Sequence, residues 1–154
     1  MQNLGIALFL ITATSSAFTF GGVSRLLGIK QHDPICDLPG DPSLTIVTNV
    51  KVTDKPSLLT KCSAIVSRCL AKPESFVAIA VIDETHMLWG GSNDPCAICT
   101  LNSLGAINQE NNGKVQAQLT EVLAEFDILP TRIYTTFNDI ARSNMGYDGR
   151  TFAG

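Results

Sequence analysis

Residues 43–82 read SLTIVTNVKVTDKPSLLTKCSAIVSRCLAKPESFVAIAVI and contain the pattern that determines the expected fold. Segment 43–49 is rich in β-branched residues, which is typical of a strand. Segment 76–82 (FVAIAVI) is almost continuously apolar, as in a strand that is covered on both faces. Between them, segment 55–70 predicts an amphipathic helix, because its apolar residues recur on one helical face: Leu58, Cys62, Ile65, Val66 and Cys69.

The second half of the chain repeats this strand–helix–strand plan. Residues 114–126 predict a second helix, and residues 132–137 (RIYTTF) predict another strand. Right-handed crossovers would place both helices on one side of a mixed four-stranded sheet, so the fold class is α/β (α+β) with two βαβ repeats. The other sheet face would stay bare unless the preceding segment or other subunits cover it, and we therefore expect an oligomer.

The amino-acid composition limits which classes of protein this chain can belong to. Of the 154 residues, 45% are hydrophobic and 16% are charged, which is a normal globular balance. The formal net charge is −3 and there is no basic run, so binding to nucleic acid has no electrostatic support. Five cysteines are an odd number and too few for a disulfide scaffold of this length, so they leave the redox compartment open.

The first seventeen residues have the pattern of a signal peptide. The apolar stretch 4–13 is about half as long as a membrane-spanning helix, so we expect no stable membrane insertion. Ser15, Ser16 and Ala17 then supply the small residues of a cleavage site, and we expect cleavage after Ala17. The secretory pathway and an extracellular location follow. Residues 1–17 contain no Lys or Arg, which departs from the usual signal-peptide pattern. The alternative is that these residues form a buried strand or an uncleaved anchor.

Residues 18–41 are interpreted as a linker or a second targeting segment. Residues 18–32 contain Arg25 and Lys30 and no acid, which resembles the two-part leaders of plastid proteins. A plain secretory linker is the alternative. Residues 33–42 (DPICDLPGDP) hold three prolines, three aspartates and a glycine, which predicts a turn-rich linker. The main domain would then occupy residues 42–154.

Residues 89–105 (WGGSNDPCAICTLNSLG) contain the pair Cys96 and Cys99. A structural zinc site usually needs a second such pair, and His32 and His86 are badly spaced, so we expect no metal. A redox pair would need an electropositive helix start, whereas Asp94 and Pro95 come directly before Cys96. Two half-buried cysteines in a turn region are the favoured interpretation, and a redox role is the alternative.

Several separated segments, in the right order, resemble the macrophage migration inhibitory factor and D-dopachrome tautomerase family of the tautomerase superfamily. They are PSLTIVTNV, AKPESFVAIAV, WGGSNDPCAICTLNSLG, RIYTTFND and NMGYDGRTFA, and together they extend over residues 42–153. The resemblance implies a tautomerase-type homotrimer and keto–enol tautomerase activity without a cofactor. It also implies cytokine-like signalling through a protein receptor as a role of another class.

The resemblance makes Pro42 the catalytic base, because the family uses the nitrogen of an N-terminal proline. A free α-amine titrates at about 7.7–8.0, and burial or a nearby cation lowers that pKa. An internal proline nitrogen is a tertiary amide and cannot serve as a base. Activity would therefore require a second cut, between Asp41 and Pro42. Lys72 matches the lysine that holds the substrate carboxylate.

The remaining site residues are also implied by the resemblance. Tyr134 would reach the pocket from the neighbouring subunit, and the others would line the substrate: Ser43, Leu104, Tyr147 and Phe152. Phe76 and Thr136 stand where the family has a tyrosine and an asparagine, which leaves substrate preference open. The expected substrate is a small aromatic keto or enol acid of the phenylpyruvate or dopachrome type. A secreted, non-catalytic signalling protein of the same fold is the alternative.

Overall fold

The computed structural model describes residues 40–154, and its first strand begins directly after Pro42. Strand β1 (Ser43–Thr48) alternates half-buried and buried residues along its length. The side chains of Leu44, Ile46 and Thr48 are buried in the core, so one face of the strand is covered and the other is not.

Helix α2 (Lys55–Leu70) begins and ends at recognisable capping residues. The Asp54 carboxylate accepts a hydrogen bond from the Ser57 N–H at 3.0 Å, and Pro56 occupies the first turn, where its missing N–H costs nothing. The helix ends at Ala71, which adopts the left-handed conformation with φ 50°. Its predicted apolar face is buried against the sheet.

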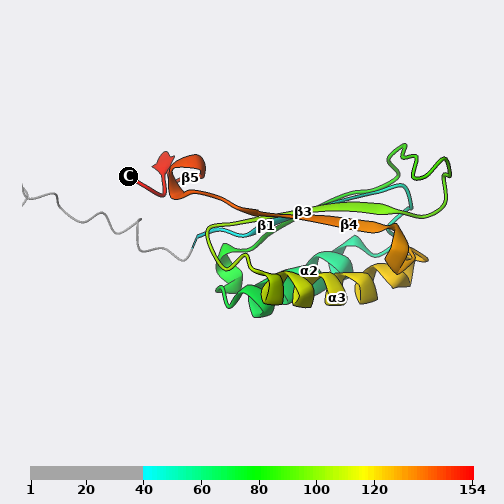
Figure 1. Cartoon of the computed structure of the whole chain (residues 1–154), viewed down its shortest axis with the longest axis horizontal. Helices are drawn as coiled ribbons and strands as arrows, with labels where there is room; N and C mark the ends of the chain where they lie inside the picture. Colours follow the sequence, from blue (N-terminus) through cyan, green and yellow to red (C-terminus); the bar gives the residue numbers. More distant parts are fainter. Residues whose placement is uncertain (1–39) are drawn as a thin grey trace, which may run out of the picture. The chain divides into compact units, whose positions relative to one another are not determined.

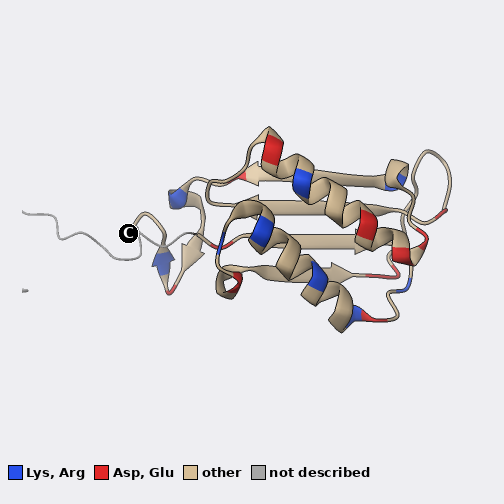
Figure 2. Ribbon diagram, turned by 90° about the horizontal axis from the view of Figure 1, so that it is seen from below, with Lys and Arg blue, Asp and Glu red and all other residues tan. Residues whose placement is uncertain are grey.

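The chain then repeats the same unit. Strand β2 (Ala78–Ile82) completes the first βαβ unit, and β3 (Ala97–Ser103), α3 (Gln109–Leu123) and β4 (Ile133–Asp139) form the second. The strand order is β2-β1-β3-β4; β1 pairs in parallel with β2 and antiparallel with β3, and β3 pairs in parallel with β4. Both helices cover the same face of this mixed sheet (Figures 1 and 2). The predicted fold class is confirmed.

Two local predictions were wrong. Helix α3 begins at Gln109 rather than Lys114, because the Asn108 side chain accepts the Asn111 N–H at 2.9 Å and caps an earlier first turn. Strand β2 is not covered on both faces: it lies at the edge of the sheet, and its outward residues Ala78, Ala80 and Ile82 are exposed. Short 3₁₀ turns flank these elements, at Glu74–Phe76, Ala124–Phe126 and Pro130–Arg132.

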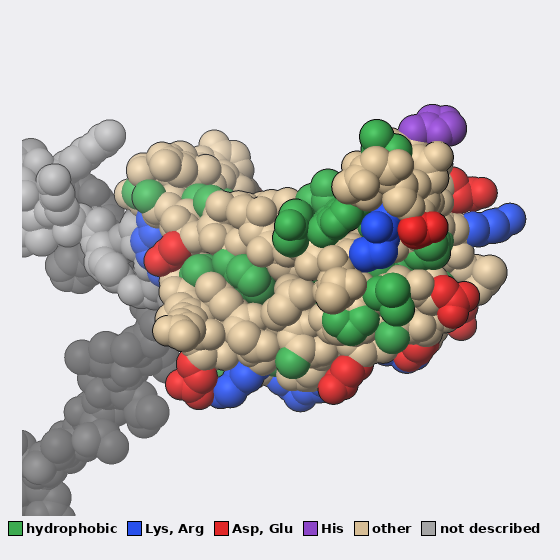
Figure 3. Space-filling model, turned by 45° about the vertical axis from the view of Figure 1, so that its right-hand side comes forward, with side chains coloured by type: hydrophobic (Ala, Val, Ile, Leu, Met, Phe, Trp, Pro, Cys, Tyr) green, Lys and Arg blue, Asp and Glu red, His purple; other side chains and the backbone are tan. Residues whose placement is uncertain are grey.

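The sheet face opposite the helices is open and partly apolar in the single chain. Ile82, Ile98 and Tyr134 are 52%, 46% and 67% exposed on this face. Figure 3 views the molecule from the side of the sheet and shows further apolar side chains at the surface. Exposed apolar area of this kind is typical of a surface that another molecule covers.

A small C-terminal hairpin lies beyond the main sheet and was not predicted. It follows the 3₁₀ turn Arg142–Asn144 and pairs β5 (Gly146–Tyr147) with β6 (Arg150–Thr151). Its residue Phe152 is fully buried, in a cluster with Leu104, Ile140 and Met145.

The predicted signal peptide (1–17), nearly all of the predicted linker or targeting segment (18–41) and Cys36 lie outside the described residues. Within residues 40–154, no helix combines the length and the apolar character needed to cross a membrane.

Candidate active site

Pro42 lies at the entry to the sheet and is fully buried. Its carbonyl oxygen accepts a hydrogen bond from the Ala78 N–H at 2.9 Å, which fixes Pro42 beside the start of β2. Gly40, two residues earlier, is also buried and has φ +83°. A Cβ atom on Gly40 would lie only 2.5 Å from the Leu104 Cβ, so the backbone before Pro42 runs directly against Leu104.

Lys72 is held at the same place by the end of α2. The Lys72 N–H donates to the Ser67 carbonyl at 3.0 Å, and the Ser67 hydroxyl donates to the Lys72 carbonyl at 2.7 Å. The Lys72 ammonium then donates to the Leu104 carbonyl at 2.8 Å. Three of the predicted site residues, Pro42, Lys72 and Leu104, therefore converge on one end of the sheet.

Charged neighbours surround the Lys72 ammonium. Burial lowers the pKa of Lys72, and the Arg142 guanidinium lowers this pKa further, while Asp139 and Asp41 act in the opposite direction. Burial raises the pKa of Asp41, and the positive charge of Lys72 opposes that rise. The side chain of Asp139 is fixed, because its Oδ1 accepts the Gly105 N–H at 2.8 Å.

Arg142 and Asp139 were missed by the sequence reasoning. Asp139 is the last residue of β4 and Arg142 follows that strand, about seventy residues after Lys72, and no spacing in the sequence connects them to it. Only the packing of the segment after β4 against Leu104 brings their charges close to Lys72.

The predicted aromatic rim has two different environments. Phe152 is fully buried next to Leu104, whereas Tyr147 is 45% exposed. The two rings stack with centroids 5.6 Å apart and planes inclined by 22°. In the single chain, Tyr147 is thus the aromatic side chain that faces solvent, and Phe152 supports it from below. Ser43 follows Pro42 as the first residue of β1 and is half-buried.

Tyr134 does not lie near the Pro42 of its own chain. It pairs with Ile98, and Ile98 pairs with Val47, which is five residues along β1 from Pro42. At about 3.3 Å per residue this separation is roughly 16 Å. Tyr134 instead packs on Trp89, with ring centroids 4.2 Å apart, and remains exposed. In the single chain it therefore lies outside any site built around Pro42.

Cys96 and Cys99 are both fully buried free thiols, and Cys99 lies within β3, so the prediction of two half-buried cysteines in a turn region was wrong. Burial raises the pKa of Cys99 to about 11, although the side chain of Thr135 opposes the rise. Burial likewise raises the pKa of Cys62 to about 12. Cys99 is therefore protonated at neutral pH, which is the opposite of a reactive thiolate. Among the residues that the structure describes, no cluster of His, Cys, Asp and Glu could hold a metal ion.

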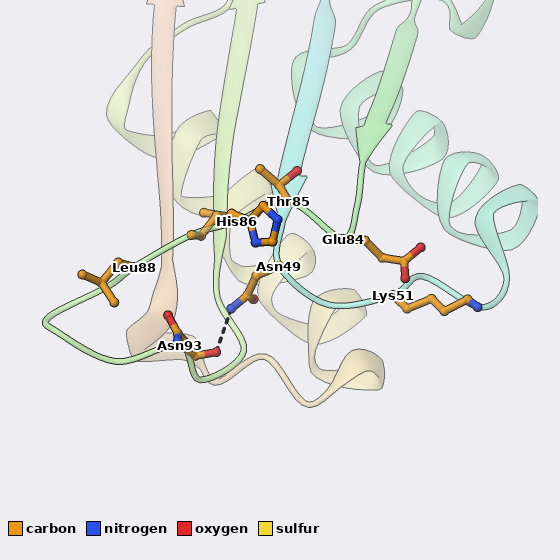
Figure 4. Close-up of a pocket in the computed structure, with 8 residues that line it drawn as sticks. Asn49, Lys51, Glu84, Thr85, His86, Leu88 and Asn93 are labelled. Atoms are coloured by element: carbon orange, nitrogen blue, oxygen red, sulfur yellow. Dashed lines mark hydrogen bonds between the residues drawn. The ribbon is translucent and has the colours of Figure 1, made fainter.

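A separate hollow of about 560 Å³ lies at the opposite end of the sheet from Pro42 (Figure 4). Its lining comes from the loops after β1 and β2 and includes Lys51, Glu84, Thr85 and His86. Asn49 and Asn93 also line the hollow, and the Asn49 side chain donates to the Asn93 carbonyl at 2.9 Å. None of the predicted site residues lines this hollow.

Comparison with known proteins gives a consistent result. The family model described as macrophage migration inhibitory factor matches residues 41–153. A macrophage migration inhibitory factor homolog from Brugia malayi is 41% identical over 113 residues, which are 72% of this chain and 98% of that relative. The macrophage migration inhibitory factor from Xenopus tropicalis is 33% identical over 73% of this chain and 99% of its own length.

A solved structure shares the fold as well. The macrophage migration inhibitory factor from Trichinella spiralis superimposes with a TM-score of 0.66 at 35% identity, covering 71% of this chain and 98% of that structure. The stretch from about Pro42 onward therefore corresponds to almost the whole length of these relatives.

Proposed function

This chain belongs to the macrophage migration inhibitory factor family, and on that premise we propose that it is a keto–enol tautomerase for phenylpyruvate- or dopachrome-like substrates. In this proposal Pro42 is the base, once proteolysis has made it the first residue. The observation that carries the proposal is the convergence of Pro42, Lys72 and Leu104, with the Lys72 ammonium bonded to the Leu104 carbonyl at 2.8 Å.

The chemistry follows from the surroundings of Pro42. A free amine at this position would be partly buried and close to the positive charge of Lys72, and both conditions lower its pKa towards neutrality. The neutral amine removes a proton from the carbon next to the substrate's keto group, and return of that proton to the keto oxygen gives the enol and restores the neutral amine. Lys72 binds the substrate carboxylate, and the nearby apolar side chain of Leu104 limits access of water.

The functional unit in this proposal is a homotrimer. Tyr134 is five residues along the strands and two strands across the sheet from its own Pro42, a separation of more than about 16 Å, so a site containing both residues needs a second copy of the chain. The open sheet face, with Ile82 and Ile98 exposed, supplies an apolar surface for such a contact. The subunit number three is taken from the family resemblance, and light scattering on the chain beginning at Pro42 would test it.

The decisive experiment compares two purified forms, one beginning at Phe18 and one beginning at Pro42, on an enolisable arylpyruvate. A positioned general base contributes roughly 10²–10⁴-fold, so the Pro42 form should be faster by about that factor. In the Pro42 form, Pro42→Gly should remove much of this gain and leave a remainder, because glycine keeps a primary amine. Equal rates in two well-folded forms would exclude Pro42 as the base.

A non-catalytic signalling role, acting through a protein receptor, is the second candidate. It is favoured for the uncut chain, because an internal Pro42 is an amide and is fully buried. We place both forms in the secretory pathway, with a plastid as the alternative destination. The N-terminal residue of protein from its native source separates the candidates: proline supports the enzyme, and Phe18 supports the signalling protein.

A further inference from the structure

We propose that Lys72 and Arg142 together form an anion subsite beside Pro42, that the Asp41 carboxylate occupies it in the uncut chain, and that the substrate carboxylate replaces Asp41 once the chain begins at Pro42. The inference rests on the proposed function for its substrate. It adds Arg142 as a substrate-binding residue. It also proposes that, in the uncut chain, the Asp41 carboxylate takes the place that the substrate carboxylate would occupy.

The three segments that form the subsite all contact Leu104. Its carbonyl accepts the Lys72 ammonium at 2.8 Å. Its side chain lies against Gly40, which directly precedes Asp41. The same side chain belongs to the cluster that includes Ile140 and Met145, the residues on either side of the turn that carries Arg142. Asp41, Lys72 and Arg142 are therefore attached to three backbone segments that meet at one residue.

Charges of both signs act on the Lys72 ammonium at this meeting point. Arg142 is a second cation near it, and Asp139 and Asp41 are carboxylates near it. Asp139 is already bonded to the Gly105 N–H, so its position is fixed by the fold. Removal of residues up to Asp41 takes away one of these two carboxylates. A ligand with one carboxylate supplies the same negative charge beside Lys72.

The two cations recognise a carboxylate in different ways. A guanidinium offers two parallel N–H donors that match both carboxylate oxygens, whereas an ammonium acts as a compact point charge. An aryl-substituted 2-oxo acid presents both oxygens of a carboxylate next to its keto oxygen, so Arg142 and Lys72 can share the two groups. The expected ligand class is therefore an aromatic acid, and the corresponding ester or alcohol should bind weakly.

A binding experiment tests the subsite without requiring turnover. The probe is 3-phenylpropionate, which has the aromatic ring and the carboxylate but no keto group, and titration calorimetry measures its affinity for the chain beginning at Pro42. Arg142→Ala should weaken binding roughly tenfold, the factor expected for loss of a hydrogen bond to a charged group. Arg142→Lys should recover part of the loss. The neutral analogue 3-phenylpropanol should bind equally to all three proteins.

Arg68→Ala is the matched control, because it removes the same charge from an exposed position on α2 where Arg68 bonds to Gln118. It should leave the affinity for 3-phenylpropionate unchanged. In the full uncut chain the probe should bind more weakly than in the Pro42 form, and Asp41→Asn should raise its affinity several-fold.

Unchanged affinity in a folded Arg142→Ala variant, or no binding of the probe to the Pro42 form, would overturn the subsite. Equal affinity in the uncut chain and its Asp41→Asn variant would overturn the role of Asp41. Failure of the proposed function has a different signature: the probe binds through Arg142 as expected, while the Pro42 form shows no tautomerase activity on an arylpyruvate.

Discussion

Mixing two defective chains should restore activity if the active site is shared between copies. One chain retains Gly40 and Asp41, so its Pro42 is blocked but its Tyr134 is normal. The other begins at Pro42 and carries Tyr134→Phe. Neither chain alone can assemble a complete site, because one has no free Pro42 and the other has no Tyr134 hydroxyl.

The expected rate follows from random assembly at equal concentrations. A site is complete when its Pro42 comes from the second chain and its Tyr134 from the first, which happens in about a quarter of the sites. If loss of the Tyr134 hydroxyl costs about tenfold, shared sites give about a quarter of the normal rate, whereas sites within one chain give about one twentieth.

The assay is arylpyruvate tautomerisation after the two chains are refolded together, with separately refolded and then combined chains as the control. A co-refolded mixture no faster than this control would contradict a shared site, provided that differently tagged chains are shown to co-assemble.

Three other predictions concern stability and the thiols. Gly113 lies inside α3 with open space around it, so Gly113→Ala should raise the free energy of unfolding, measured in urea, by about 0.5–1 kcal/mol. Gly105 has equally open space but φ +73°, so Gly105→Ala should lower the free energy of unfolding by about 1–2 kcal/mol. Equal effects of the two variants would contradict the argument from backbone conformation. Serine at both Cys96 and Cys99 should leave tautomerase activity largely intact, and a folded trimer without activity would assign the thiols a function. Burial raises the pKa of Cys62 to about 12 and of Cys99 to about 11, so the unfolded chain loses these protons at a lower pH than the folded chain. The free energy of unfolding should therefore fall as pH rises from 9 through 11. Cys62→Ala should make this fall less steep, and an unchanged dependence of the free energy of unfolding on pH would exclude the Cys62 thiol as its cause.

The sequence predicts best where local preference and tertiary packing agree. Strand β1 and helix α2 lie where expected because a β-branched run and a capped amphipathic pattern each specify one structure. The start of α3 was missed because residues 109–114 (QENNGK) are polar and include Gly113, so they carry no hydrophobic periodicity. Capping by Asn108 stabilises this turn, and an isolated asparagine is a weak signal in a sequence.

The candidate site divides in the same way. Pro42, Lys72 and Leu104 were expected to act together from the family resemblance, and in the structure they are neighbours. Arg142 could not be predicted, because its proximity to Lys72 depends on how the chain turns after β4. The buried position of Phe152 also depends on the hairpin, whose two-residue strands are too short to produce a periodic pattern.

Pro42 can change its chemistry without changing the fold. Proline has no N–H, so the start of β1 uses only its carbonyl, which accepts from Ala78 in the register that pairs Ser43 with Ala78. Cleavage before Pro42 turns an amide nitrogen into an amine and leaves that hydrogen bond intact. A protease must nevertheless reach a bond between Asp41 and a fully buried Pro42, with Gly40 pressed against Leu104. The protease therefore cuts either before the domain folds or when residues 40 and 41 move away from Leu104. In the second case, the movement that exposes the bond also removes Asp41 from the subsite at Lys72 and Arg142.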